Sequence, residues 1–312
     1  MPPAPDTSAS VSLPHDEFFK EIFGDIEHAR DLIHGILPPE LLEILDLAHL
    51  QRENTSFLTA QLAEDFADLV FTCPITGGSA LVALLLEHKS WAPRYPHLQL
   101  LAYMLGVWEQ SEKDGRPLPP VIPIVLYNGQ GAWKVREFST CFPHLPDRLR
   151  AFLPEFRFLL LDLAHEPLAP LRERFHNRSV QVAIELMRAI FSPTEVTALM
   201  RRLTPADGPP DRDLAYRFLR VVLRYIFTRS DVDQRDALNL ALNPEIRRLA
   251  MTLEEQILQR GEQRGIQQGL VQGLEQGARV AKMEDARKLR DHGVAWAIIT
   301  DATGVTPADL GD

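Results

Sequence analysis

The stretch Ala80-Leu-Val-Ala-Leu-Leu-Leu-Glu87-His88-Lys89 decides the fold class, because a continuous apolar run ends there in three polar residues. Such a short apolar run predicts a buried strand. An earlier run, Phe66-Ala-Asp68-Leu-Val-Phe-Thr-Cys73, predicts a neighbouring strand. The Thr76-Gly-Gly-Ser79 segment between the two runs supplies turn residues, so the sequence predicts a β-hairpin.

Three charged side chains are expected to converge at one end of this hairpin. Side chains alternate along a strand, so Glu87 and Lys89 share a face, and strand pairing would bring Asp68 close to it. Gathering these charges beside an apolar strand is unfavourable unless something binds there. Mg²⁺ suits such a place, since it prefers one or two carboxylates together with water and phosphate oxygens. This reasoning favours phosphodiester hydrolysis; the alternative is a simple ion pair of Lys89 with either carboxylate.

The same residues carry a family resemblance. Asp68 followed by Glu87-x-Lys89 on the next strand resembles the core motif of the PD-(D/E)XK phosphodiesterase superfamily. The flanking blocks resemble the bacterial recombination-promoting nuclease/putative transposase family from about residue 14 to about residue 165. These blocks are His15-Asp-Glu-Phe-Phe-Lys20, Ala29-Arg-Asp-Leu32, Leu37-Pro-Pro-Glu-Leu-Leu42, Thr55-Ser-Phe57, Ala67-Asp-Leu69, Leu86-Glu-His-Lys-Ser90, Leu100-Leu-Ala-Tyr-Met104, Pro123-Ile-Val-Leu-Tyr-Asn-Gly129 and Trp133.

The resemblance implies a restriction-endonuclease-like α/β fold, with a mixed sheet flanked by helices, that acts on DNA. It implies that Asp68, Glu87 and the backbone carbonyl of His88 hold a divalent metal, with Mg²⁺ favoured and Mn²⁺ or Ca²⁺ as alternatives. Lys89 would then stabilise developing negative charge or help to position the attacking water.

Weaker candidates surround this motif. Asp16 either adds a carboxylate to the site or caps the first helix, whose amino end favours an acidic residue. Gln99 falls on the following helix, where superfamily members often place a polar residue facing the site. Arg94 is a candidate DNA contact. The side chains of His88 and His97 are interpreted as surface or packing residues, and the Tyr127–Gly131 segment either as a family signature or as a turn after a strand.

Composition fits a cytoplasmic chain without a membrane segment. Of the 312 residues, 45% are hydrophobic, and no apolar run is long enough to cross a membrane. The two cysteines, Cys73 and Cys141, are far apart and indicate neither a disulfide framework nor a zinc site. A net charge of -10 argues mildly against nucleic acid, although binding requires only a local basic surface.

The predicted order of elements is helix, three strands, helix and two strands. Pro123 favours an edge or bulge position in its strand. The helix near 96–110 is expected to place Leu98, Leu101, Leu105 and Trp108 on one face. The other segments are expected as helices near 15–35 and 40–47, an extended segment near 55–59, and strands near 121–126 and 156–161. The chain is divided into a disordered tail (1–13), a nuclease-like domain (14–165), an α-helical appendage (166–255) and a helical tail (256–312).

The helical tail repeats glycine at every fourth residue, from Gly261 to Gly277. Each glycine costs a helix about 0.8–1 kcal/mol relative to alanine, so five cost roughly 4–5 kcal/mol. One interpretation is close helix–helix approach in a homodimer, and the other is a semi-flexible spacer. Beyond the repeat, short helical patterns joined at Gly293, with Thr306 as an N-cap, form a small C-terminal unit.

Three classes of function remain open. The first is a metal-dependent DNA endonuclease that promotes recombination or mobile-element activity. The second is a transposase that also joins strands, although Lys89 beside Glu87 favours hydrolysis. The third is a catalytically inactive relative that binds DNA or protein.

Overall fold

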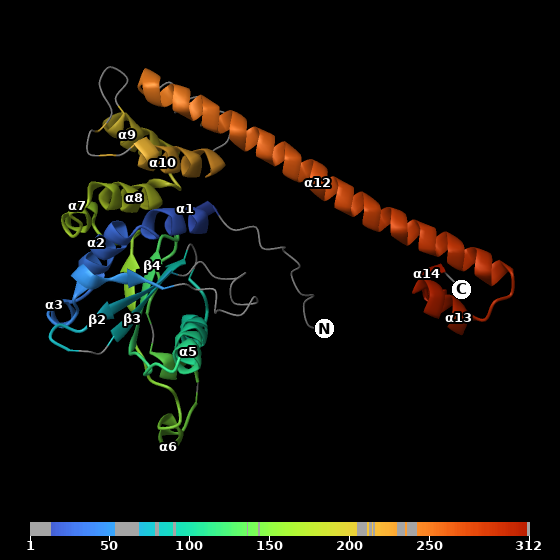
Figure 1. The fold of residues 1–312 in the computed structure, drawn as a ribbon, viewed down its shortest axis with the longest axis horizontal. Helices are drawn as coiled ribbons and strands as arrows, with labels where there is room; N and C mark the ends of the chain where they lie inside the picture. Colours follow the sequence, from blue (N-terminus) through green and yellow to red (C-terminus); the bar gives the residue numbers. More distant parts are fainter. Residues whose placement is uncertain are drawn as a thin grey trace. The chain divides into compact units, whose positions relative to one another are not determined.

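The computed structural model, shown in Figure 1, divides the chain into two compact units, residues 1–250 and 251–312. It describes residues 14–53, 69–78, 81–89, 92–135, 137–142, 144–204, 211, 214, 216–229, 235 and 242–310. The tail at 1–13 and the extended segment at 55–59 lie outside these residues. The predicted mixed α/β sheet, flanked by helices and followed by a helical C-terminal region, is confirmed. The domain boundaries after residues 165 and 255 stay predictions.

The first unit is built on one sheet with the strand order β1-β2-β3-β4-β5 in the described residues. Strands β1, β2 and β3 are antiparallel neighbours, whereas β3, β4 and β5 are parallel. In the β2–β3 pair Leu69 lies opposite Leu86, which confirms the predicted antiparallel pairing. The strands are β1 (Gln51–Arg52), β2 (Leu69–Pro74), β3 (Leu81–Lys89), β4 (Val121–Tyr127) and β5 (Leu159–Asp162).

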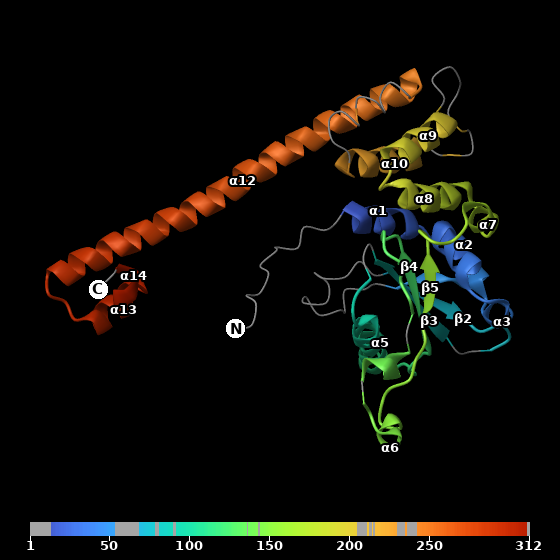
Figure 2. The same ribbon diagram turned by 180° about the vertical axis from the view of Figure 1, so that it is seen from behind.

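Helices cover the sheet from both sides, as Figure 2 shows from behind. On one side α1 (Pro14–Phe23) packs on β3, where the Phe19 ring stacks on the His88 ring at 5.3 Å between centroids. On the other side α5 (Pro96–Lys113) buries Tyr103 in a cluster with Val125 of β4. The two faces of β3 therefore meet different helices.

The first predicted helix, near 15–35, is two helices, α1 and α2 (Ile26–Ile36). The break lies at Gly24 and Asp25. The Asp25 carboxylate caps α2 by accepting the amides of Glu27 and His28, at 3.0 and 3.4 Å. A Cβ at Gly24 would overlap the Lys20 carbonyl, so the chain turns where only glycine fits.

The apolar face predicted for α5 is wrong. Leu98 and Leu105 of that face are exposed by 55% and 52%, whereas Leu100, Tyr103 and Val107 pack towards the sheet. Both stripes of this helix are apolar, so helical periodicity alone does not choose between them. Packing against the sheet decides between them, because the stripe that carries the large Tyr103 ring is the one buried there.

Strand β4 lies between β3 and β5, yet among the described strands Pro123 itself is paired on the β3 side alone. Pro123 is paired with Leu85 of β3, while pairing with β5 begins one residue later, at Ile124 opposite Leu159. The proline, which has no amide hydrogen, therefore precedes the part of β4 that is paired on both sides.

The helical pattern predicted after residue 166 is present. Helix α8 (Arg178–Ala189) packs on α1 and α2, and α10 (Tyr216–Arg229) packs on α1. The other helices in the described part of this unit are α3 (Pro39–Leu42), α6 (Asp147–Arg150), α7 (Leu168–Glu173), α9 (Pro193–Leu203) and the 3-10 helices at Leu47–His49 and Phe138–Cys141. Cys73 and Cys141 are both free thiols.

The glycine repeat lies within one continuous helix, α12 (Pro244–Asp291). The small C-terminal unit adds α13 (Trp296–Thr303) and α14 (Pro307–Leu310) around a buried cluster of Ala286, Ile299 and Val305. Although α12 has 48 residues, none of the described helices combines the length and apolar character that a membrane crossing requires.

Candidate functional site

The predicted motif occupies the carboxyl end of β3. Glu87 and Lys89 lie in the part of the strand that pairs in parallel with β4. Lys89 is partly buried, and its carbonyl accepts the amide of Asn128 at 3.0 Å. Asp68 and the side chain of Glu87 fall outside the described part of the structure. The convergence of the three charged side chains therefore stays a prediction.

The middle residue of the motif, His88, forms a buried polar network on the α1 side of the sheet. Its Nδ1 is 3.0 Å from Asp16 Oδ1, and its Nε2 is 2.9 Å from Asn128 Oδ1. The Asn128 amide nitrogen in turn donates to the Met187 carbonyl of α8 at 3.5 Å. The ring is thus held between the Asp16 carboxylate on one side and the side-chain oxygen of Asn128 on the other. The interpretation of His88 as a packing residue fits its 3% exposure.

A second buried pair lies beside this network. The Tyr225 hydroxyl of α10 is 2.5 Å from His15 Nδ1, and the rings meet edge to face at 5.5 Å. Burial, reinforced by the nearby His88 and Arg229, lowers the pKa of His15 to about 4. Burial likewise raises the pKa of Tyr225. His15 is therefore neutral near pH 7 and shares a hydrogen bond with the Tyr225 hydroxyl, while Asp16 binds His88.

The face of β4 that meets the α5 side carries an aromatic group next to the motif. Tyr127, the register partner of Lys89, donates its hydroxyl to the Gly131 carbonyl at 2.5 Å. The Trp133 ring packs edge to face on Tyr127 at 5.1 Å. Burial, and secondarily the Asp162 carboxylate, raise the pKa of Tyr127. A Cβ at Gly129 would overlap the Tyr127 ring, which explains glycine at that position.

Gln99 lies in the first turns of α5, on the helix that covers this face. Its Nε2 donates to the hydroxyl of Tyr103 at 3.3 Å, and Tyr103 is buried against the sheet. The structure therefore directs Gln99 towards the Tyr103 side of α5. A catalytic role for Gln99 stays a prediction.

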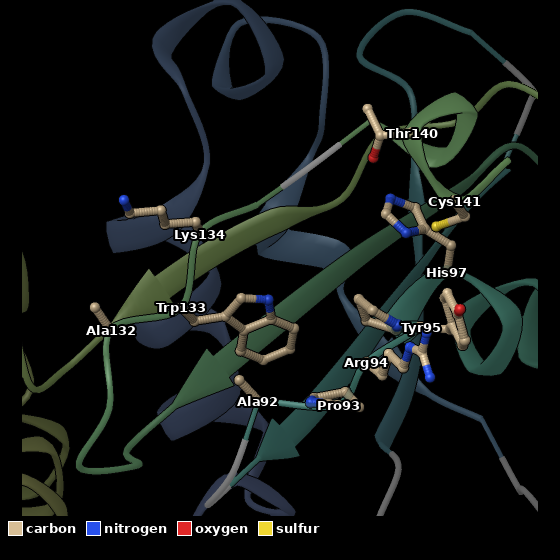
Figure 3. Close-up of a pocket in the computed structure, with 11 residues that line it drawn as sticks. Ala92, Pro93, Arg94, Tyr95, His97, Ala132, Trp133, Lys134, Thr140 and Cys141 are labelled. Carbon is tan, nitrogen blue, oxygen red and sulfur yellow. The ribbon is translucent and has the colours of Figure 1, made fainter. Parts of the chain in front are cut away.

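A pocket of about 530 Å³ opens beside this region, between the segment that follows β3 and the segment that follows β4. Figure 3 shows Trp133 on one side of the view and Arg94, Tyr95 and His97 on the other. Arg94 is exposed, and its guanidinium lies 5.0 Å from the centroid of the Tyr95 ring. Lys134 adds a second cation to the lining.

The described side chains include no group of three His, Cys, Asp or Glu residues that could hold a metal ion. Because Asp68 and the Glu87 side chain are not among them, this finding leaves the predicted metal site untested. Sequence reasoning missed the role of Asn128, which it read as a family signature or a turn. The pairing of Asp16 with His88 and the pocket beside Trp133 were missed as well.

The fold is that of an α/β protein with a mixed sheet. Strand β3 carries the motif at its carboxyl end, and the buried polar network of His88 lies on the α1 side of this strand. The chain belongs to the family described as "Putative transposase, YhgA-like", whose profile matches residues 13–206. No solved structure shows a significant match to the chain.

Relatives of the chain carry names from recombination. Recombination-promoting nuclease RpnD of Escherichia coli O157:H7 is 32% identical over 39% of this chain and 48% of the relative. Recombination-promoting nuclease RpnC of Escherichia coli strain K12 is 30% identical over 39% of this chain and 41% of the relative. The chain thus spans less than half of the length of either. A shorter K12 relative, the putative inactive recombination-promoting nuclease-like protein YjiP, is 29% identical over 32% of this chain and 98% of its own length.

Proposed function

We propose that this protein is a metal-dependent DNA endonuclease of the PD-(D/E)XK type that promotes recombination or mobile-element activity. The observation that carries the proposal is the placement of Lys89 at the carboxyl end of β3, opposite Tyr127 of the parallel strand β4 and three residues beyond Leu86, which pairs with the antiparallel strand β2. Ligand sites in α/β sheets favour the carboxyl ends of strands. The names of RpnD and RpnC support a nuclease.

The proposed site needs the β2–β3 ladder to continue by one residue beyond the Leu69–Leu86 pair, which would set Asp68 opposite Glu87. These two carboxylates and the His88 carbonyl would hold the cation, with Mg²⁺ favoured. When bound, a divalent cation polarises the scissile phosphate and lowers the pKa of its water.

The chain's own residues do the remaining work in this proposal. The Lys89 ammonium stabilises charge that develops on the phosphate oxygens or orients the attacking water. The His88 ring, held by Asp16 and Asn128, fixes the end of the strand that carries these groups. Asp16 acts through His88 and not as a direct ligand, since its carboxylate is engaged with the buried ring.

Inactivity is the second candidate, and the name of YjiP is the observation that favours it. An inactive protein would keep the fold and the His88 network but would not cut DNA. A strand-transfer activity is a third outcome, which a strand-joining assay with a short DNA end separates from hydrolysis.

The test is incubation of purified protein with supercoiled plasmid in Mg²⁺, Mn²⁺ or Ca²⁺ separately. Asp68→Ala and Glu87→Ala should abolish cleavage, because each removes a metal ligand. Lys89→Ala should slow cleavage roughly 10²–10³-fold, the effect of losing one transition-state donor, and leave metal binding largely intact.

Matched controls are Glu43→Ala for the carboxylates and Lys113→Ala for the lysine, because both residues are exposed and lie outside the motif. The controls should cut like the wild type. Wild-type cleavage by repurified Asp68→Ala protein would place the activity elsewhere or in a contaminant.

A further inference from the structure

The pocket beside the motif combines aromatic rings with positive charge. Its described lining includes Tyr95, which is 39% exposed, and the half-buried Trp133. Arg94 and Lys134 also line it, and the described lining residues include no Asp or Glu. In a chain with a net charge of -10, a concave surface with two cations and no carboxylate is a local exception.

The amino end of helix α5 opens on the same pocket, because Tyr95, Pro96 and His97 all line it. The amino end of a helix carries partial positive charge and favours phosphate groups. Here the helix end does not stand alone, since Arg94 lies only two residues before Pro96, the first residue of α5, and lines the same pocket. The pocket therefore offers a place for a phosphate next to a place for a flat ring.

The position of the pocket links it to the motif. Arg94 follows Lys89 by five residues, and Trp133 packs on Tyr127, the register partner of Lys89. The Trp133 side of the pocket is therefore linked to the motif-bearing strand through Tyr127 of the neighbouring strand β4. A volume of about 530 Å³ falls in the range of pockets that enclose small organic groups.

We propose that this pocket binds one unpaired nucleotide of the DNA substrate, close to the bond that is cut. The base stacks on Trp133 and Tyr95, and its phosphate lies against Arg94 and the amino end of α5. This inference rests on the proposed endonuclease function and adds a substrate class, namely DNA with unpaired nucleotides at the cleavage point, such as a flap, a gap or a single strand.

The chemistry favours an unpaired nucleotide over a duplex. Aromatic rings bind any exposed base by its face, and in a duplex both faces are already stacked. Extruding a paired base costs a few kcal/mol, whereas an unpaired base avoids most of this cost. The enzyme should therefore prefer single-stranded or gapped DNA even where it reads no sequence.

The test measures binding without cleavage. Fluorescence anisotropy in EDTA compares a labelled single-stranded oligonucleotide with the same sequence as a duplex, using the full-length protein. Wild-type protein should bind the single strand more tightly. Tyr95→Ala and Trp133→Ala should each weaken single-strand binding by about 5- to 150-fold, the range that corresponds to 1–3 kcal/mol of stacking per base.

Two further variants sharpen the test. Arg94→Ala should lower the slope of log affinity against log salt by about one, as expected for one lost phosphate contact. Tyr216→Ala is the aromatic control, because Tyr216 lies on α10 with 52% exposure and does not line the pocket. Trp133 also packs against the core. If the Trp133→Ala protein melts at a lower temperature than the wild type, the test therefore rests on the exposed Tyr95 and its variant Tyr95→Ala.

The outcomes separate this inference from the proposed function. Wild-type affinity of Tyr95→Ala for single strands, or no preference of the wild type for single strands, overturns the pocket and leaves the metal-dependent cleavage test untouched. Loss of single-strand binding by Tyr95→Ala in a protein that never cuts DNA with any metal supports the pocket and overturns the nuclease.

Discussion

Replacing His15 by glutamine should remove a defined part of the acid sensitivity of the fold. His15 is 4% exposed, and its burial, together with the nearby His88 and Arg229, holds its pKa at about 4, against 6.5 for an ordinary histidine. The folded state therefore releases a proton that the unfolded chain keeps at mildly acidic pH. The contribution of His15 to the free energy of unfolding is therefore full above about pH 6.5. It falls as the pH is lowered towards 4 and changes no further below that.

The magnitude follows from these two pKa values. The full shift corresponds to about 3 kcal/mol, since one pKa unit is worth about 1.4 kcal/mol. Between pH 7.5 and pH 5 the linkage relation gives a loss of about 2 kcal/mol in the free energy of unfolding. The measurement is urea denaturation of wild type and His15→Gln at both values of pH. The wild type should lose about 2 kcal/mol more than the variant over this interval.

Tyr225→Phe is the matched control, because it keeps the aromatic wall around His15 and removes only the hydroxyl that lies 2.5 Å from its ring. This protein should be less stable at every pH by about 1 kcal/mol, yet keep the pH dependence, because burial is the largest cause of the shift. Equal pH dependence of wild type and His15→Gln would refute the reasoning. Loss of the pH dependence in Tyr225→Phe would assign the shift to the hydrogen bond.

Two other changes test the close contact between Gly129 and the Tyr127 ring and the role of the helical tail. Gly129→Ala should destabilise the fold by about 1–3 kcal/mol in urea denaturation, because its Cβ overlaps the Tyr127 ring, whereas Gly131→Ala, with open space around it, should change stability by less than about 0.5 kcal/mol. Deleting the chain from about Gly261 onward tests whether α12 dimerises: loss of a dimer by solution mass with cleavage retained supports the interface. An unchanged monomer favours a spacer, and loss of cleavage by a folded truncation contradicts a tail that lies outside the site.

The parts of the fold that depend on local patterns could be predicted from the sequence. The apolar runs that end at Cys73 and Lys89 are strands that pair in antiparallel fashion, as their composition and the turn between them indicate. The prediction of the buried face of α5 failed because contacts with residues distant in the sequence determine which face of the helix is buried. Helix α5 has two apolar stripes, and only the sheet selects the one with Tyr103. The break at Gly24 could have been predicted from Asp25, a residue type that favours helix N-caps, although the surrounding pattern is helical throughout.

The polar network around His88 and the adjacent His15–Tyr225 pair could not be predicted from local sequence patterns. His88 and its partner Asn128 are 40 residues apart, and His15 and Tyr225 are 210 residues apart. In sequence each residue has an ordinary explanation as a cap, a turn or a packing residue. Only the fold shows that all four are buried and paired.

This network gives a physical reason for a polar residue between Glu87 and Lys89. Positions 87 and 89 share one face of a strand, so position 88 must point into the layer formed by α1 and α8. An apolar residue could fill that space but would leave the strand end free to rotate or slip. His88 instead bonds α1 through Asp16 and the end of β4 through Asn128, and leaving one such buried group unpaired costs about 1–3 kcal/mol. A slip of β3 by one residue would break both bonds at once, so the buried ring fixes the register on which the spacing of the motif depends.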